Sequence, residues 1–333
     1  MRDKMYLYAV ARVKALENNL LSRSTVDRML EAPAPEEALK ILGETDYGNY
    51  FGEVDNVYDF EKALDQGLRA AYKVIDDSTG DRRFTLLSRL KYDFHNLKVL
   101  MKEKYLGEDY RSILSHTGSI GVETLRKAVD DKNMTGFNPH IRDAYEKADT
   151  DFELNGDPRR IDLILDRGLY DYIYELAVEI GDEDLIDLVK TEIDLLNINT
   201  LLRVRKMGES VRLLEMALID GGFLDRSVFL GAMGEPAGSF ADRLSSTRYD
   251  RVAVEGIGAW IDTGSSTVLE KMSDDLLLNM AKKGKYAAFG VLPIIGYLRA
   301  KENEVRVVRM IMVGKINRIP ADTLRERLRD LYV

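Results

Sequence analysis

The part of the sequence closest to a metal site runs from Asp151 to Asp162, with Gly156 at the sixth position, where a calcium-binding EF-hand loop has its glycine. Such a loop ends in a bidentate glutamate at position twelve, but Asp162 stands there. Pro158 and Arg160 also occupy positions that do not suit calcium binding. We therefore interpret this segment as a polar turn before a helix that begins near Arg160.

Paired aspartates raise a second possibility, the DDxxD arrangement with which prenyl synthases hold a divalent metal. The chain has three such pairs, and each lacks the third aspartate; the pairs are Asp76-Asp77, Asp130-Asp131 and Asp274-Asp275, followed by Gly80, Met134 and Leu278. None of the three histidines belongs to HExxH or another recognised metal-binding spacing; they are His95, His116 and His140. We predict no metal site.

The glycine motifs that bind nucleotides are incomplete. Gly284-Lys285 is followed by Tyr286 and lacks the upstream glycine of a phosphate-binding loop, and Gly256 and Gly258 lack the third glycine of GxGxxG. The chain has no cysteine, which excludes disulfides, thiolate zinc sites and cysteine nucleophiles. We therefore predict a protein with no catalytic residue and no bound cofactor.

The elements that position the side chains are expected to be helices. Apolar residues recur three to four positions apart, as in Phe94, Leu97, Met101 and Tyr105. The nearest candidate for a strand, Val252–Val254, is too short to outweigh this pattern. Charged residues make up 32% of the 333-residue chain, which favours long helices with solvated outer faces. The sequence predicts an all-α fold.

A charged pattern repeats along three of the predicted helices. Each copy has an acid, a polar or apolar residue three positions later, a further polar or basic residue at five, and a cation at eleven. The copies are Asp93, Asn96, Lys98, Lys104; Asp194, Asn197, Asn199, Arg205; and Glu304, Val307, Arg309, Lys315, with a fainter copy in Arg12 and Lys14. Repeated charges are most often exposed i,i+4 pairs, whereas Asn96 and Asn197 have apolar neighbours and are candidates for buried polar anchors.

A second motif precedes each copy. Leu64–Leu68 matches Leu165–Leu169, and Leu269–Lys271 is a weaker match. The acid of this motif lies 28 residues before Asp93 and Asp194, and 34 before Glu304. The third unit is therefore the longest, and we also expect an insertion in its Gly-rich segment 221–264. Units of roughly 100 residues are too long for a solenoid. We expect three homologous lobes around a pseudo-threefold axis.

The expected domains follow this repeat: lobe units at 1–90, 91–190 and 191–300, and C-terminal helices at 301–333 that complete a lobe begun elsewhere.

Four stretches, in order along nearly the whole chain, resemble the C subunit of archaeal and bacterial A/V-type ATPases, whose eukaryotic V-ATPase counterpart is the d subunit. They are Tyr8–Leu16, Tyr92–Lys98, Asp157–Asp166 and Tyr297–Lys315. The resemblance implies a funnel of three helical lobes without an active site. It also implies a socket that couples the central stalk, built from D- and F-type subunits, to the ion-translocating membrane ring during ATP synthesis or ATP-driven ion transport. Val307, where the other copies have Asn, leaves the contacts of the third lobe open.

The resemblance places the chain at the cytoplasmic face of the membrane as a peripheral component. The longest nearly uncharged stretch, Tyr286–Leu298, is too short to span a bilayer, so we expect a soluble chain. A net charge of −9 argues against nucleic-acid or anionic-lipid binding by bulk electrostatics, although a local basic patch remains open. The alternatives are a helical protein-binding scaffold outside the ATPase and a hydrolase with a carboxylate site.

Overall fold

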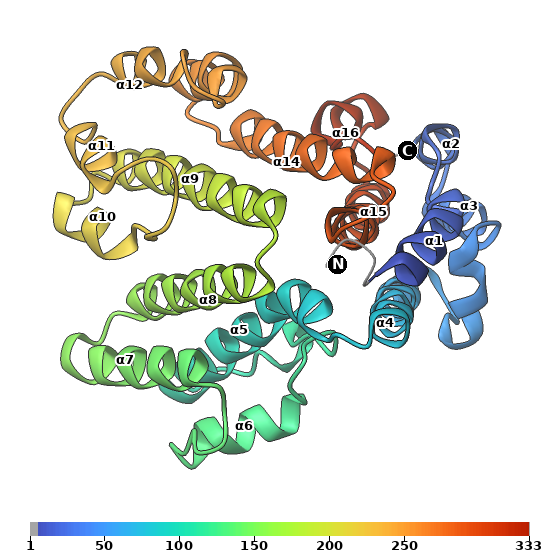
Figure 1. The fold of residues 1–333 in the computed structure, drawn as a ribbon, viewed down its shortest axis with the longest axis horizontal. Helices are drawn as coiled ribbons and strands as arrows, with labels where there is room; N and C mark the ends of the chain where they lie inside the picture. Colours follow the sequence, from blue (N-terminus) through green and yellow to red (C-terminus); the bar gives the residue numbers. More distant parts are fainter. Residues whose placement is uncertain (1–5, 333) are drawn as a thin grey trace. The chain divides into compact units, whose positions relative to one another are not determined.

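The computed structural model describes residues 6–332. Within this range every regular element is helical and no strand is present (Figure 1). The all-α prediction is confirmed. Val252–Val254, the candidate strand, lies in a π-helical turn, η6 (Val252–Ile257).

The chain forms two compact units, which are described separately. Unit 1 joins residues 1–85 to residues 265–333, and unit 2 comprises residues 86–264. The two ends of the sequence therefore fold together in unit 1.

Unit 1 is built around α15 (Leu292–Ile316), whose buried residues include Ile294, Leu298, Val308 and Ile311. The helix packs against α1, α3, α4 and α14, which supply apolar side chains from both ends of the chain. The other elements of the unit are α1 (Leu7–Leu16), η2 (Glu17–Asn19), α2 (Arg23–Glu31), α3 (Pro35–Gly43), η3 (Asp46–Glu53), η4 (Val57–Asp59), α4 (Phe60–Thr79), the first turn of α5 (Arg83–Leu106), α14 (Thr267–Lys282), η7 (Lys283–Tyr286) and α16 (Ala321–Arg327).

Unit 2 contains most of α5. It also contains α7 and α8, and these two helices pack along one another. Its long helix α9 is buried along its length through residues such as Leu188, Ile193 and Leu201. The elements after α5 are η5 (Arg111–Ile113), α6 (Val122–Asp130), α7 (Pro139–Asn155), α8 (Pro158–Ile180), α9 (Glu183–Lys206), α10 (Val211–Ala217), α11 (Arg226–Gly231), α12 (Ala237–Leu244), η6 and α13 (Gly258–Thr263).

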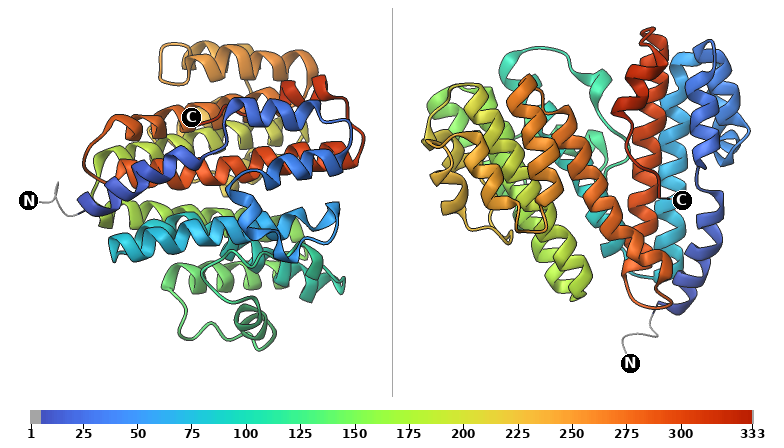
Figure 2. Two further views of the ribbon diagram at one scale, coloured as in Figure 1. Left: turned by 90° about the vertical axis from the view of Figure 1, so that its right-hand side faces the viewer. Right: turned by 90° about the horizontal axis from the view of Figure 1, so that it is seen from above.

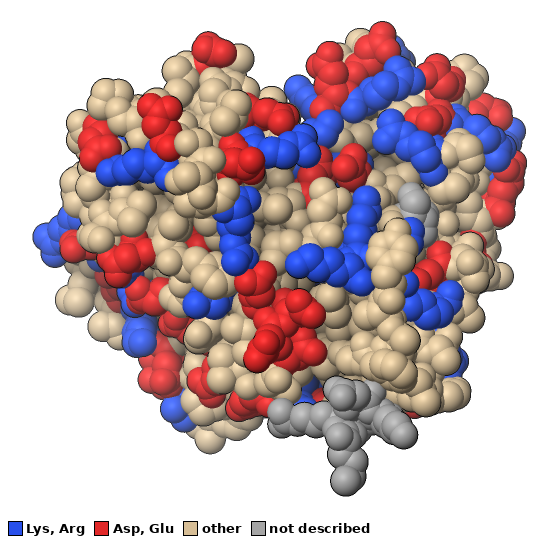
Figure 3. All heavy atoms as spheres, turned by 45° about the horizontal axis from the view of Figure 1, so that its top comes forward, with Lys and Arg blue, Asp and Glu red and all other residues tan. Residues whose placement is uncertain are grey.

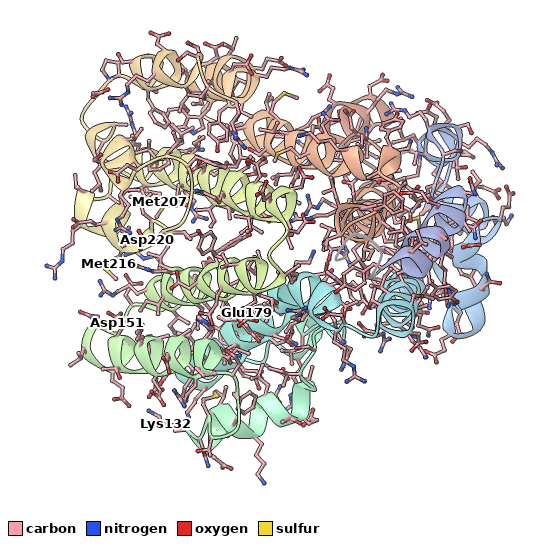
Figure 4. The ribbon with its side chains drawn as sticks, in the orientation of Figure 1. Lys132, Asp151, Glu179, Met207, Met216 and Asp220 are labelled. Carbon is pink, nitrogen blue, oxygen red and sulfur yellow. The ribbon has the colours of Figure 1, made fainter. Side chains whose placement is uncertain are left out.

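The segment with the glycine of a calcium loop is a junction between two helices. Asp151 lies on α7 (Figure 4), and its two oxygens accept hydrogen bonds from Nε and Nη2 of Arg160 at 2.6 and 2.5 Å. Gly156 ends α7 with φ +65°, a backbone conformation that glycine adopts without strain. The next helix begins at Pro158, two residues before the predicted start, because Asp157 caps it by accepting from Arg159 N.

Candidate functional site: three helix clamps

The three acids of the repeated pattern are buried on three long helices. Asp93 on α5, Asp194 on α9 and Glu304 on α15 are 2%, 0% and 3% exposed. A buried carboxylate needs hydrogen-bond donors, because it has lost its water. All three carboxylates find these donors in backbone N–H groups that belong to other segments.

In each case a donor lies just before a short helix. Ile120 N donates to Asp93 at 2.9 Å, two residues before α6 begins. Phe223 N and Leu224 N donate to Asp194 at 2.9 and 3.2 Å, just before α11. Leu21 N donates to Glu304, two residues before α2.

The cation eleven residues after each acid binds the opposite end of the same short helix. Lys104 Nζ donates to Val129 O at 2.5 Å, at the end of α6. Arg205 Nη1 donates to Ala232 O at 2.9 Å, directly after α11. Lys315 Nζ donates to Leu30 O and Ala32 O, both at 2.6 Å, at the end of α2.

This spacing has a physical reason. Eleven helical residues span about 16 Å, the length of a short helix with its two caps. A negative group at the N-terminus of a helix and a positive group at its C-terminus both stabilise the helix dipole. We call each arrangement a helix clamp: a long helix holds a short, parallel helix at both ends. The three clamps join α5 to α6, α9 to α11 and α15 to α2.

Two clamps have an additional anchor, the asparagine three residues after the acid. Asn96 Nδ2 donates to Ser115 O at 2.7 Å and Asn96 Oδ1 accepts from Ser115 N at 2.8 Å. Asn197 forms the same pair with the backbone of Ile219, both at 2.9 Å. The side chain thus binds both the backbone N–H and the backbone C=O of one residue in the loop that leads to the short helix. Val307 makes no such bond because it has no polar atom in its side chain.

Side chains complete the environment of the acids. Tyr249 Oη donates to Asp194 at 2.6 Å. Glu304 accepts from Tyr47 Oη at 3.3 Å and pairs with Lys301 at 2.7 Å. Lys301 lies over the ring of Tyr47, 4.5 Å from its centre.

Burial raises the pKa of all three carboxyl groups, and it is the largest influence in each case. The hydrogen bonds from Ser119 to Asp93 and from Tyr249 to Asp194 oppose that rise, as does the charge of Lys301 beside Glu304.

Two glycines allow the aspartates to approach the loop backbone. A Cβ at Gly118 would lie 2.4 Å from Asp93 Oδ1, and a Cβ at Gly222 would lie 2.0 Å from Asp194 Oδ1. Each glycine lies two residues before an N–H that the acid accepts. In the third clamp the equivalent position is Asn19, and the acid there is a glutamate, whose longer side chain reaches Leu21 N.

The other predicted residues lie outside the clamps. Lys98 pairs with Asp166 of α8 at 2.5 Å, and Arg309 pairs with Glu61 of α4 at 2.7 Å. Asn199 Nδ2 donates to Leu195 O one turn earlier, at 3.0 Å. The fainter N-terminal copy forms no clamp: Arg12 is exposed and donates to Tyr8 Oη at 3.4 Å, whereas Lys14 Nζ donates to the backbone oxygens of Gly284 and Lys285 at 2.7 Å.

The sequence pattern did not single out several residues of the clamps: Tyr47, Gly118, Gly222, Tyr249 and Lys301. The glycines carry a signal that sequence alone could reveal, because both lie 25 to 28 residues after a repeated acid. The tyrosines carry none, since they come from segments of different local structure.

No group of three or more His, Cys, Asp or Glu side chains in the described part of the chain is arranged to hold a metal ion. Among residues 6–332 no helix combines the length and the apolar character needed to cross a bilayer.

The cations are testable parts of the clamps. Lys315→Met is expected to lower the free energy of unfolding by about 1–2 kcal/mol, because two terminal carbonyls of α2 lose a charged donor. Amide exchange should become faster in residues 23–31 and change less in α6 and α11. Lys40→Met is the control, since Lys40 forms only an exposed pair with Glu37; equal effects of the two substitutions would contradict the clamp.

The all-helical fold and its repeated clamps fit a structural component of a larger assembly, and comparison with known proteins shows which class. Residues 9–327 match the model of the ATP synthase (C/AC39) subunit family. The chain belongs to this family, the C subunits of V-type and A-type ATP synthases, and it is therefore a component of a rotary ATPase complex that serves ion transport and ATP synthesis.

Particular relatives are similar over nearly their whole length. The C subunit of the V-type sodium ATPase of Enterococcus hirae is 27% identical over 325 residues, covering 96% of this chain and 97% of the relative. The C subunit of the A-type ATP synthase of Methanocaldococcus jannaschii is 28% identical, covering 97% and 86%. Its counterpart from the A-type ATP synthase of Haloferax volcanii is 25% identical, covering 96% of each.

Proposed function

We propose that this chain is a non-catalytic adaptor in the central rotor of an A/V-type rotary ATPase. It forms a socket that couples the central stalk, of D- and F-type subunits, to the membrane ring at the cytoplasmic face, during ATP synthesis or ATP-driven ion transport. The observation that carries the proposal is the recurrence of the helix clamp in a chain that belongs to the C/AC39 family.

An adaptor between stalk and ring must transmit torque without deforming, and the clamps provide this rigidity. A short helix packed only by apolar contacts can shift along its neighbour at little cost. A helix held at both ends by charge-assisted hydrogen bonds, buried at the acid and half-buried at the cation, loses those bonds when it moves, and each is worth about 1.5–3 kcal/mol. The acids are buried while their partners lie on other segments, so each clamp fixes a long helix to a short one.

The clamps also support the proposed three-lobed funnel. Each clamp belongs to one of the proposed lobes: α5 with α6, α9 with α11, and α15 with α2. The third lobe combines α15 and α2, which come from opposite ends of the sequence. On this proposal the C-terminal helices of 301–333 complete the lobe that residues 1–90 contain, and 91–190 and 191–300 contain the other two.

Charged residues of both signs are interspersed on the face seen in Figure 3, where acidic side chains also gather in small clusters. Complementary charges orient partners and raise association rates more than they raise affinity. The proposed socket therefore binds through its apolar contacts, and its charges select the orientation of the stalk and ring.

A three-component binding experiment tests the proposal. The purified chain is mixed with detergent-solubilised membrane ring and with an affinity-tagged stalk complex. We expect the tagged stalk to retain the ring only when the chain is present, because the chain touches both. Retention of the ring in its absence, or failure of the chain to bind either component, would contradict the socket and favour a scaffold role elsewhere in the complex.

A further inference from the structure

One end of unit 1 carries exposed aromatic side chains. Tyr286 is 87% exposed and Phe289 is 52% exposed, and both belong to the connection between α14 and α15. Tyr8, on the first turn of α1, is 65% exposed. Single exposed apolar residues are ordinary, so their significance depends on whether they lie together and on what surrounds them.

The contacts of α1 place these residues at the same end. Lys14 lies beside Gly284, and Leu21 lies beside Glu304. From Lys14 to Leu21 the chain therefore runs parallel to α15 and in the same direction. Gly284 belongs to the α14–α15 connection, so Lys14 is already at this end of the unit. Tyr8, six residues before Lys14 on the same helix, lies about 9 Å further along the axis, away from the middle of α15. Both views of Figure 2 show the start of α1 and this connection at one end of the unit.

The same end carries cations that form no ion pair within the described part of the chain. Lys282 and Lys283 form no ion pair with any described residue. Arg12 is exposed and, among the residues that the structure describes, donates to the neutral Tyr8 hydroxyl and to no acid. Glu17, the acid at the end of α1, is already bound to Lys14 at 3.3 Å and to Tyr332 Oη at 3.1 Å. A positive surface in a chain of net charge −9 suits a negatively charged partner.

We propose that this basic-aromatic patch, formed by Tyr8, Arg12, Lys282, Lys283, Tyr286 and Phe289, binds the headgroups of anionic phospholipids. Tyrosine and other amphipathic rings favour the boundary between headgroups and acyl chains. Each Lys or Arg near an anionic membrane surface adds about 1 kcal/mol of attraction, roughly fivefold in binding. The chain thus touches the membrane directly as well as through its protein partners.

The structure favours a lipid surface over an acidic protein segment. A protein segment is held by pockets and by hydrogen bonds of fixed geometry. Here Tyr286 and Phe289 are exposed on the α14–α15 connection, and Lys282 and Lys283 form no ion pair with a residue that the structure describes. A fluid surface of mobile headgroups does not require fixed donors. This inference goes beyond stalk–ring coupling and does not depend on it.

Vesicle sedimentation of the full chain tests the proposal. We expect binding to vesicles of equal parts phosphatidylcholine and phosphatidylserine, weak binding to phosphatidylcholine alone, and loss of binding at high salt, which screens exposed charges. Lys282→Glu with Lys283→Glu should lower binding to the anionic vesicles by about 25-fold or more. Tyr286→Ala with Phe289→Ala should lower it by about fivefold or more.

Matched controls separate the patch from general charge and apolarity. Lys40→Glu with Lys73→Glu makes the same change of charge at side chains that are 71% and 74% exposed. Tyr58→Ala with Leu154→Ala removes apolar residues that are 72% and 79% exposed. Both control variants should bind within about twofold of the unaltered chain, because they leave every cation and ring of the patch in place. Absence of binding to anionic vesicles, or equal losses in patch and control variants, would overturn the proposal. Absence of vesicle binding is the result expected if the patch binds an acidic protein instead.

Discussion

Asp194→Asn is expected to lower the free energy of unfolding by about 2–4 kcal/mol, although the two side chains have nearly the same size. Asp194 accepts hydrogen bonds from Phe223 N, Leu224 N and Tyr249 Oη. An asparagine offers one oxygen, and its amide nitrogen would face a donor. At least one buried polar group therefore loses its partner. Denaturant unfolding measures the change.

A local measurement and a matched substitution make this prediction specific. Amide exchange should become faster in residues 221–231, where the clamp holds the start of α11. Asp166→Asn is the control because Asp166 has a 41% exposed side chain and pairs with Lys98; its cost should stay below about 1 kcal/mol. A loss of stability at Asp194 no larger than that of the control would show that the buried carboxylate does not hold α11.

Glu304→Leu is expected to have the largest effect, a loss of about 3–5 kcal/mol. The substitution leaves the Lys301 ammonium, whose side chain is 9% exposed, without its carboxylate. It also removes the acceptor of Leu21 N and of Tyr47 Oη. Leu21 lies in the segment that leads into α2, so losing its hydrogen bond should loosen the contact between this segment and α15.

Thermal and denaturant unfolding of the double variant Lys301→Met with Glu304→Leu provides the control. Removing both charges leaves no uncompensated ion, so the double variant should be more stable than Glu304→Leu alone. If the single and double variants unfolded alike, the loss would come from altered packing instead of the unpaired lysine.

The repeat in the sequence identified the positions that form the clamps, although it did not predict what they bind. The constant spacing of Asp93 and Asp194 from the preceding motif identified equivalent positions on α5 and α9, and the cation eleven residues later marked the other end of each clamp. Asn96 and Asn197 were candidates for buried anchors, and they are 0% and 2% exposed, each donating one hydrogen bond to the backbone and accepting one from it.

The sequence pattern could not identify the groups that the three acids bind. The acids accept from main-chain N–H groups, which every residue except proline possesses, so residue type does not identify the donor. The partner of Glu304 is Leu21, 283 positions away, and a local pattern carries no information about such a distance. Gly118 and Gly222 indicate that a carboxylate lies close to the loop backbone, but only when it is already known that the acid contacts that loop.

Local chemistry explains the helix start that the sequence interpretation placed imprecisely: Asp157 caps α8, so the helix begins at Pro158 and not near Arg160. The segment before it is a turn between helices, and Arg160 binds both oxygens of Asp151, the residue at the first position of the apparent calcium loop. In the Gly-rich segment 221–264 the chain forms α11, α12, η6 and α13. Short helices of this kind depend on tertiary packing more than on intrinsic propensity, which is why periodicity did not reveal them.

The proposed coupling role is tested most directly by carrying the three-component experiment into membranes. ATP-driven ion transport and ATP hydrolysis are measured together in vesicles that hold the assembled ATPase, with and without this chain. We predict that without the chain hydrolysis continues while transport stops, and that adding the purified chain restores transport. Transport that persisted in its absence would contradict the role of this protein as the link between stalk and ring.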